Sequence, residues 1–190
     1  MLTLKGTQVL ETPRLVLRPF AERDGEAIYR NWASDPEVAR YVTWNAHQSV
    51  DESRELCHIW IKEGENPQCF QWAIELKEIG EAIGSISVVE WNAESGVAEV
   101  GYAIGRAFWR KGITSEACRE LCRYLFEECG FKRVTACHDA GNPASGRVME
   151  KCGLRYTHDD EKWLEKKGRM VPLKCYEITR TEWETMQKGA

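Results

Sequence analysis

Apolar residues recur with a helical period over residues 113–129, which makes this stretch the clearest element of the sequence. Ile113, Ala117, Leu121 and Leu125 are spaced four residues apart, and charged residues occupy the opposite side. A helix with one apolar stripe buries that stripe against the rest of the fold. The pattern therefore predicts an amphipathic helix with one face in the core.

The same periodicity predicts three further helices. Apolar residues at helical spacing favour a helix over residues 22–32. Ser49 followed by two acidic residues is typical of the first turn of a second helix. Residues 144–152 form the third, which Gly153 ends.

Short runs of alternating or β-branched residues predict the strands. These runs cover residues 11–20, 70–76, 82–91, 97–104, 133–137, 154–163 and 175–180. Turn-like sequences separate the second, third and fourth runs, which favours an antiparallel meander. A strand–helix–strand unit follows the meander, so the sequence predicts an α+β fold with a mixed sheet.

Composition is that of an ordinary globular protein. The 190 residues are 43% hydrophobic and 29% charged, and we expect one domain over residues 1–190 with its core at about 12–180. A net charge of −4 disfavours a nucleic-acid or anionic-membrane partner and suits a cationic amine. The sequence has neither a membrane-length apolar run nor a signal-peptide pattern, so we expect a cytoplasmic protein.

Eight cysteines raise the question of a disulfide or a zinc site. None forms a C-x-x-C pair, and Cys118 and Cys122 fit the apolar side of the central helix as small buried side chains. The four histidines show no metal-binding spacing such as H-E-x-x-H. We therefore expect reduced thiols and no metal.

The loop between the strand at 97–104 and the central helix is suited to bind an anion. Arg110 and Lys111 precede Gly112, whose missing side chain lets a ligand approach the backbone. A helix N-terminus also exposes unpaired N–H groups and the positive end of the helix dipole. The loop predicts an anion site, and the alternative is a tight turn beside two solvated cations.

Two segments resemble signatures of the GNAT N-acetyltransferases. Residues 109–114, Trp-Arg-Lys-Gly-Ile-Thr, resemble the acyl-CoA pyrophosphate loop, whose pattern is Gln or Arg, two residues, Gly, one residue, then Gly or Ala. Trp109 and Thr114 depart from that pattern at its two ends. Residues 142–154 resemble the second signature, an Asn and a Ser that open a helix ending in Lys, one residue, Gly and an apolar residue.

Two more segments are similar to the RimJ/RimL-type branch, which acetylates protein N-termini and assorted small amines. They are Glu-Val-Gly-Tyr at 99–102 and Thr-Pro-Arg-Leu-Val-Leu-Arg-Pro at 12–19. The resemblance implies a GNAT-like acyl-CoA N-acyltransferase fold, with a central, mostly antiparallel sheet flanked by about four helices. It also implies an acetyl-CoA-dependent N-acetyltransferase, in which a protein N-terminal amine or a small-molecule amine attacks acetyl-CoA directly in a ternary complex.

The resemblance implies that backbone groups hold much of the acetyl-CoA. The implied residues are Arg110, Lys111, Gly112, Ile113 and Thr114 for the pyrophosphate, and Tyr102, Ala103 and Ile104 for the pantetheine arm. Asn142 matches the Asn that contacts pantetheine, and Ser145 lies near the expected thiol. Without the family, Asn142 and Ser145 are ordinary residues for the opening of a helix.

The acid and the base are less clearly marked. Glu99 is a candidate base, acting directly or through water, although strict alternation turns it away from its neighbours' face unless a bulge intervenes. Glu90 and His138 are rival candidates. Met149 stands where many GNAT enzymes carry a Tyr as general acid, which leaves Ser145 or solvent to protonate the CoA thiolate.

Aromatic residues near position 41 are candidates for the acceptor pocket. We expect Tyr41 and Trp44 to line it and Trp32 to cover the core. A non-catalytic acyl-CoA sensor or regulatory module stays open as an alternative, whereas a nucleotide-binding enzyme is opposed by the missing G-x-x-x-x-G-K-[ST] motif. The sequence identifies neither the amine nor the choice between monomer and homodimer.

Overall fold

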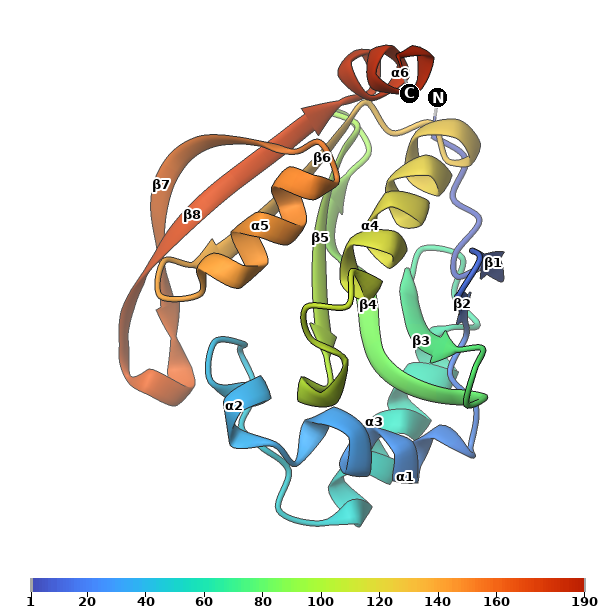
Figure 1. The fold of residues 1–190 in the computed structure, drawn as a ribbon, viewed down its shortest axis with the longest axis vertical. Helices are drawn as coiled ribbons and strands as arrows, with labels where there is room; N and C mark the ends of the chain where they lie inside the picture. Colours follow the sequence, from blue (N-terminus) through green and yellow to red (C-terminus); the bar gives the residue numbers. More distant parts are fainter. Residues whose placement is uncertain (1, 190) are drawn as a thin grey trace.

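The structure is a computed structural model that describes residues 2–189. Its strands form one sheet in the order β1-β2-β3-β4-β5-β6-β8-β7 (Figure 1). The strands are β1 (Leu10–Glu11), β2 (Leu15–Arg18), β3 (Gln71–Leu76), β4 (Glu81–Asn92), β5 (Val97–Ile104), β6 (Arg133–Asp139), β7 (Arg155–Leu164) and β8 (Arg169–Thr179). Neighbouring strands are antiparallel except β5 and β6, which confirms the expected mixed and mostly antiparallel sheet.

Six α-helices accompany the sheet, two more than the sequence predicted. They are α1 (Asp24–Ile28), α2 (Pro36–Ala39), α3 (Val50–Glu63), α4 (Ile113–Arg123), α5 (Pro143–Lys151) and α6 (Arg180–Lys188). π-Helical turns extend α1 over Tyr29–Ala33 and α4 over Tyr124–Glu128. The additional helices are the four-residue α2 and α6, which starts with a reciprocal capping box between Thr179 and Glu182. No helix within residues 2–189 is long and apolar enough to cross a bilayer.

Helices cover both faces of the sheet, because side chains alternate along each strand. Trp72 and Ile74 of β3 are fully buried in the cluster that α4 contributes to. Ala73, between them, instead packs in a second cluster with Ile28 and Trp32. Figure 1 shows α4 and α5 lying across one face of the sheet, while α1 and α3 lie together at one end of the molecule.

The parallel strands β5 and β6 are neighbours over only part of their length. Their pairing ends at Glu99 and Thr135, although β5 continues to Ile104 and β6 to Asp139. On its other edge β5 stays paired with β4 as far as Ile104. The separation leaves the β6-facing edge of Tyr102–Ile104 without a strand partner in the described sheet.

Cys137 and Cys175 form a disulfide, so the expectation of reduced thiols is wrong for this pair. The two residues face each other across β6 and β8, with their Cα atoms 4.2 Å apart. They are 38 positions apart in sequence, and only the sheet register brings them together. The other six cysteines are free, and Cys118 and Cys122 are buried in the core as expected.

Candidate active site

A cleft of about 460 Å³ lies where β5 and β6 separate. Its walls come from residues 37–42, the end of β5, the loop into α4 and the first part of α5. It brings together most of the residues implied for acetyl-CoA, namely Tyr102, Ala103, Ile104, Arg110, Gly112, Ile113, Thr114, Asn142 and Ser145. Lys111 belongs to the same loop but does not line the cleft.

The loop before α4 turns sharply because two of its residues adopt left-handed backbone conformations. Arg110 has a φ of 63°, and Gly112, the N-cap of α4, has a φ of 75°. No side chain caps the start of this helix, so its first amides are not occupied by a capping group. A Cβ at Gly112 would meet only Arg14 Nη2, at 3.6 Å. The start of α4 is therefore open to an anion.

Residues from the first segment of the chain brace this loop, which sequence reasoning missed. The guanidinium of Arg14 donates to the Lys111 carbonyl at 2.9 Å and to the Glu116 carboxylate at 2.7 Å. The Thr12 hydroxyl donates to the same carboxylate at 2.6 Å. Burial opposes the charge on Glu116, but these hydrogen bonds outweigh it and lower the Glu116 pKa. In the sequence, the resemblance of the Thr-Pro-Arg segment to the family was the signal that could have indicated these contacts of Thr12 and Arg14.

Trp109, which departs from the family pattern, also supports the loop. Its indole Nε1 donates to the carbonyl of Ile104 at 2.9 Å and so ties the loop to the end of β5. The cleft is positively charged although the chain has a net charge of −4. Its lining includes the basic residues Arg40, Arg110, Arg147 and Lys151, against the single acidic residue Glu37. This local charge favours an anionic ligand.

Ser145 and Tyr102 meet across the cleft. The Tyr102 hydroxyl lies 3.0 Å from Ser145 Oγ and donates to the Ser145 carbonyl at 3.0 Å. Burial raises the pKa of Tyr102 well above its ordinary value, so the phenol stays protonated. Met149 is buried in the core. Because its side chain is a thioether, α5 supplies no phenol at that position. Sequence reasoning assigned only the main chain of Tyr102 and missed this side-chain contact.

Asn142 occupies the N-cap position of α5 and lines the cleft. Its backbone amide donates to the Asp139 carbonyl at 2.7 Å, which closes the turn between β6 and α5. Its side chain makes no capping hydrogen bond to the helix. The amide group of Asn142 is thus available for a ligand in the cleft.

Glu99 does not line this cleft. The irregularity that could have changed its side lies in β4, between Val88 and Glu90, and β5 itself alternates regularly. Glu99 therefore points to the face of β5 opposite Tyr102. Burial raises the Glu99 pKa, and the nearby charge of Lys162 on β7 only partly opposes this.

The two rival bases differ in environment. Glu90 is exposed at the end of β4. His138 is buried, and its Nδ1 donates to the Asp139 carbonyl at 2.8 Å. Its Nε2 has no hydrogen-bond partner among the described residues and faces Gly146 of α5, where an added Cβ would come within 2.7 Å. Neither residue lines the cleft.

The two aromatic residues expected at the acceptor pocket are separated. Tyr41 lines the cleft, with Lys167 Nζ 5.7 Å from its ring centroid. Trp44 does not line the cleft and packs against the second core cluster. Its carbonyl accepts a hydrogen bond from Lys166 Nζ at 2.9 Å. Trp32 is buried in that cluster, as expected.

An open strand edge that leads to an anion-ready helix start is suited to hold an extended, phosphorylated ligand. Residues 14–155 match the acetyltransferase (GNAT) domain family. The chain therefore belongs to the GNAT family, and it is an N-acetyltransferase. The expected family and fold are confirmed.

Relatives and solved structures of similar length support this assignment. The uncharacterized N-acetyltransferase p20 of Bacillus licheniformis is 27% identical over 93% of this chain and 98% of its own length. The FsC-acetyl coenzyme A-N(2)-transacetylase of Aspergillus fumigatus is 31% identical over 98% of this chain and 83% of its own length. The structure of RimL, a ribosomal L7/L12 alpha-N-protein acetyltransferase in complex with coenzyme A, shares the fold, with a TM-score of 0.78 at 17% identity over 90% of this chain and 98% of that one. The likeness to RimL shows a shared fold.

Proposed function

We propose that this chain transfers an acetyl group from acetyl-CoA to a primary amine by direct attack in a ternary complex, with residues 1–190 acting as one domain. The observation that carries the proposal is the separation of β5 from β6, which leaves the edge of Tyr102–Ile104 facing a cleft. Amides of a pantetheine arm can pair with that edge as a neighbouring strand would. A pyrophosphate at the start of α4 would accept hydrogen bonds from the backbone amides of Arg110–Thr114.

Ser145 is the proposed proton donor to the departing thiolate. The proposal is supported by its hydroxyl, which lies in the cleft wall and is in contact with the protonated phenol of Tyr102. Asn142 is the proposed contact for pantetheine, because its side chain lines the cleft and caps no helix amide. Holding thioester and amine together can by itself lower the barrier by roughly 7–11 kcal/mol in favourable cases.

Glu99 is the proposed base for the amine, acting directly or through water. Because Glu99 and Tyr102 point to opposite faces of β5, the amine would approach from the face opposite α5 and reach the thioester through the gap between the strands. A carboxyl whose pKa is raised by burial is better matched to proton transfer from an amine than an exposed one. Tyr41, in the cleft wall, is the proposed aromatic contact of the acceptor, whereas Trp44 is a weaker candidate because it packs against the second core cluster and does not line the cleft.

An acceptor screen tests this function. The purified chain is incubated with acetyl-CoA and with two sets of acceptors, peptides with free α-amino groups and small-molecule amines, and released CoA is measured. These two sets follow from the names of the relatives, one of which acts on a protein N-terminus and another on an N(2) amine. CoA release with members of one set supports the proposal and identifies the amine class. Calorimetric binding of acetyl-CoA without release on any acceptor would favour an acyl-CoA sensor instead.

A further inference from the structure

A cluster of potential metal ligands lies on the β6–β8–β7 part of the sheet, and none of its residues lines the cleft. Cys137, Cys175 and His158 occupy matched positions on three adjacent strands, because Cys175 pairs with Cys137 on one side and with His158 on the other. Donor atoms of His158, Asp160 and Cys175 all lie within 4.8 Å of one another. Cys137 Sγ is bonded to Cys175 Sγ, so a fourth donor is adjacent.

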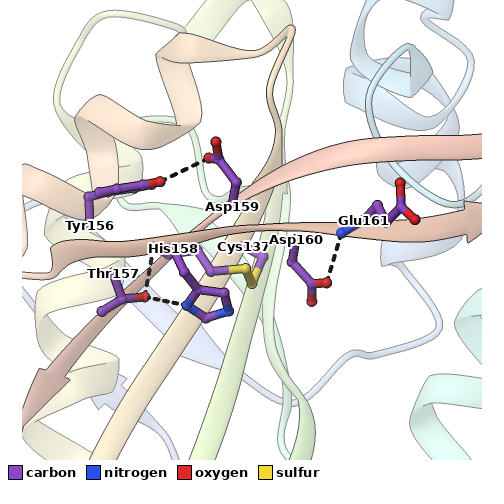
Figure 2. Close-up of a disulfide and its surroundings, with 8 residues drawn as sticks. Cys137, Tyr156, Thr157, His158, Asp159, Asp160 and Glu161 are labelled. Carbon is purple, nitrogen blue, oxygen red and sulfur yellow. Dashed lines mark hydrogen bonds between the residues drawn. A yellow bond between two sulfur atoms is a disulfide. The ribbon is translucent and has the colours of Figure 1, made fainter.

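The side chains of β7 point to two sides of the strand, and the candidate metal ligands lie on one of them. Figure 2 shows Thr157, His158 and Asp160 on the side of the strand that carries the disulfide, and Asp159 on the other side. The β-bulge between Tyr156 and His158 shifts the register there and turns His158 toward the disulfide. Asp159 is already engaged on its own side by Tyr156 and Lys174, each at 3.0 Å.

Thr157 fixes the tautomer of His158. The Thr157 hydroxyl donates its single proton to the Cys175 carbonyl at 3.0 Å. Its contact with His158 Nδ1 at 2.9 Å is therefore one in which Thr157 accepts, so the ring proton is on Nδ1. The lone pair is then on Nε2, which is the state in which an imidazole binds a metal.

We propose that, once the disulfide is reduced, Cys137, Cys175, His158 and Asp160 bind one zinc ion. Two thiolates, an imidazole and a carboxylate are ligands of the kind zinc prefers, at about 2.3 Å for sulfur and roughly 2.0–2.2 Å for nitrogen and oxygen. Around a tetrahedral ion with such bonds, neighbouring donor atoms are roughly 3.3–3.8 Å apart. The three donors lie within 4.8 Å of one another, and His158 and Asp160 are exposed, each held by one local hydrogen bond, so small side-chain movements would bring them to that spacing.

The disulfide and the zinc site exclude each other, because both use the same two sulfur atoms. A dithiol reductant gives two electrons and two protons to the Cys137–Cys175 bond, and it leaves as its own disulfide while two thiols form. Zinc then replaces the two thiol protons, which pass to solvent. A small disulfide oxidant takes two electrons back from the thiolates, reforms the cross-strand bond and releases the ion. The inference does not depend on the proposed acetyl transfer.

Zinc binding to reduced and oxidised protein tests the proposal. The chain is reduced with dithiothreitol, freed of it by anaerobic gel filtration and titrated with Zn²⁺ alone in competition with a chromophoric chelator. We expect about one ion per reduced chain and an affinity at least about 100-fold lower for the oxidised chain, because two ligands are then lost. Co²⁺ in place of Zn²⁺ should give thiolate-to-metal charge-transfer absorption that disappears on oxidation. A reduced chain that binds no Zn²⁺ would overturn the proposal.

Variants distinguish this site from the six free cysteines. Asp160→Asn and His158→Gln should each weaken Zn²⁺ binding by about tenfold or more. Asp159→Asn is the matched control, since its carboxylate lies on the other side of β7, and it should bind as the wild type does. Cys175→Ser should abolish binding. Because His158 and Asp160 are exposed, their variants should fold, so they test the site even if Cys175→Ser fails to fold. Undiminished Zn²⁺ binding in both variants would mean that the metal binds elsewhere.

Discussion

The hydroxyl of Tyr102 lies 3.0 Å from the Oγ of Ser145, and this contact joins β5 to α5 across the cleft. The two residues are 43 positions apart, and each was assigned a different role from sequence. Because the Tyr102 phenol donates its one proton to the Ser145 carbonyl, its oxygen can accept a hydrogen bond from the Ser145 hydroxyl and so orient that hydroxyl. We therefore propose that Tyr102 positions Ser145, in addition to the proposed contact of its main chain with the ligand.

Tyr102→Phe should lower kcat by about two- to tenfold, the equivalent of one neutral hydrogen bond, and leave the KM for acetyl-CoA nearly unchanged. Ser145→Ala should lower kcat by roughly ten- to a hundredfold, since a thiolate is a good leaving group and needs modest acid assistance. The double variant should be no slower than Ser145→Ala, because both act on one proton. Steady-state kinetics measure this, with the exposed Tyr156→Phe as control. Losses that multiply would show that Tyr102 acts independently of Ser145.

Gly112→Ala should strongly reduce acetyl-CoA binding while the chain stays folded. The added Cβ meets only one atom, at 3.6 Å, so the variant bears chiefly the left-handed backbone strain of about 1–2 kcal/mol. The methyl group nevertheless occupies the space above the α4 amides that a pyrophosphate needs. Calorimetry measures the affinity. Gly80→Ala is the matched control, with a φ of 66° and no heavy atom within 4 Å of the added Cβ, and it should bind normally. Equal affinities in the two variants would mean that the anion binds elsewhere.

Local patterns in the sequence predicted the elements that carry the site. The apolar spacing from Ile113 identified α4, and Gly112 identified the turn that opens it, because both depend on residues close in the chain. Such patterns could not predict contacts between segments that are distant in the sequence. The brace between Arg14 and Glu116 spans 102 positions, so no local periodicity marks it.

Two other features were missed, one for a local reason and one because it depends on the whole sheet. The helix α6 follows β8 without a break, and the last predicted strand ended only at residue 180, so its capping residue Thr179 was taken as strand. The disulfide depends on the register of β6 against β8, which sets Cys137 opposite Cys175. Register follows from the packing of the whole sheet, and the sequence alone did not specify it.

Breaking the buried charge cluster around Arg18 of β2 should strongly destabilise the fold. Arg18 forms a two-pronged contact with Asp24, at 2.7 and 2.8 Å, and its Nε donates to Glu75 at 2.6 Å. Asp24 is almost fully buried, so Arg18→Ala would leave its charge uncompensated. We expect a loss of about 3–5 kcal/mol in the free energy of unfolding, measured by urea denaturation. Arg54→Ala, which removes exposed ion pairs, is the control and should leave the midpoint almost unchanged.

Glu99 should control the acidic limb of the pH–rate profile. Only the carboxylate can accept a proton, and burial raises the Glu99 pKa above 4.5, so kcat/KM should rise with pH through a pKa above that value. Glu99→Gln should lower the rate and remove this limb, while any rise caused by deprotonation of the free amine remains. pH–rate profiles measured with an amine of low pKa separate the titration of Glu99 from the deprotonation of the amine. A Gln variant with the wild-type rate and profile would exclude Glu99 as the base.

The same residue should lower stability at neutral pH. A folded-state pKa above the unfolded one means that the folded chain holds its proton more tightly, so stability falls as pH rises from the unfolded to the folded pKa of Glu99. Gln resembles the protonated form and has no such loss. Glu99→Gln should therefore be more stable than the wild type at neutral pH, with the difference vanishing at about pH 3, where both states of the wild type are protonated. Urea midpoints at the two pH values measure this, with Glu94→Gln in an exposed turn as control. A Gln variant that is less stable at neutral pH would mean that attraction to Lys162 outweighs the burial of Glu99, and the direction of its pKa shift would be reversed.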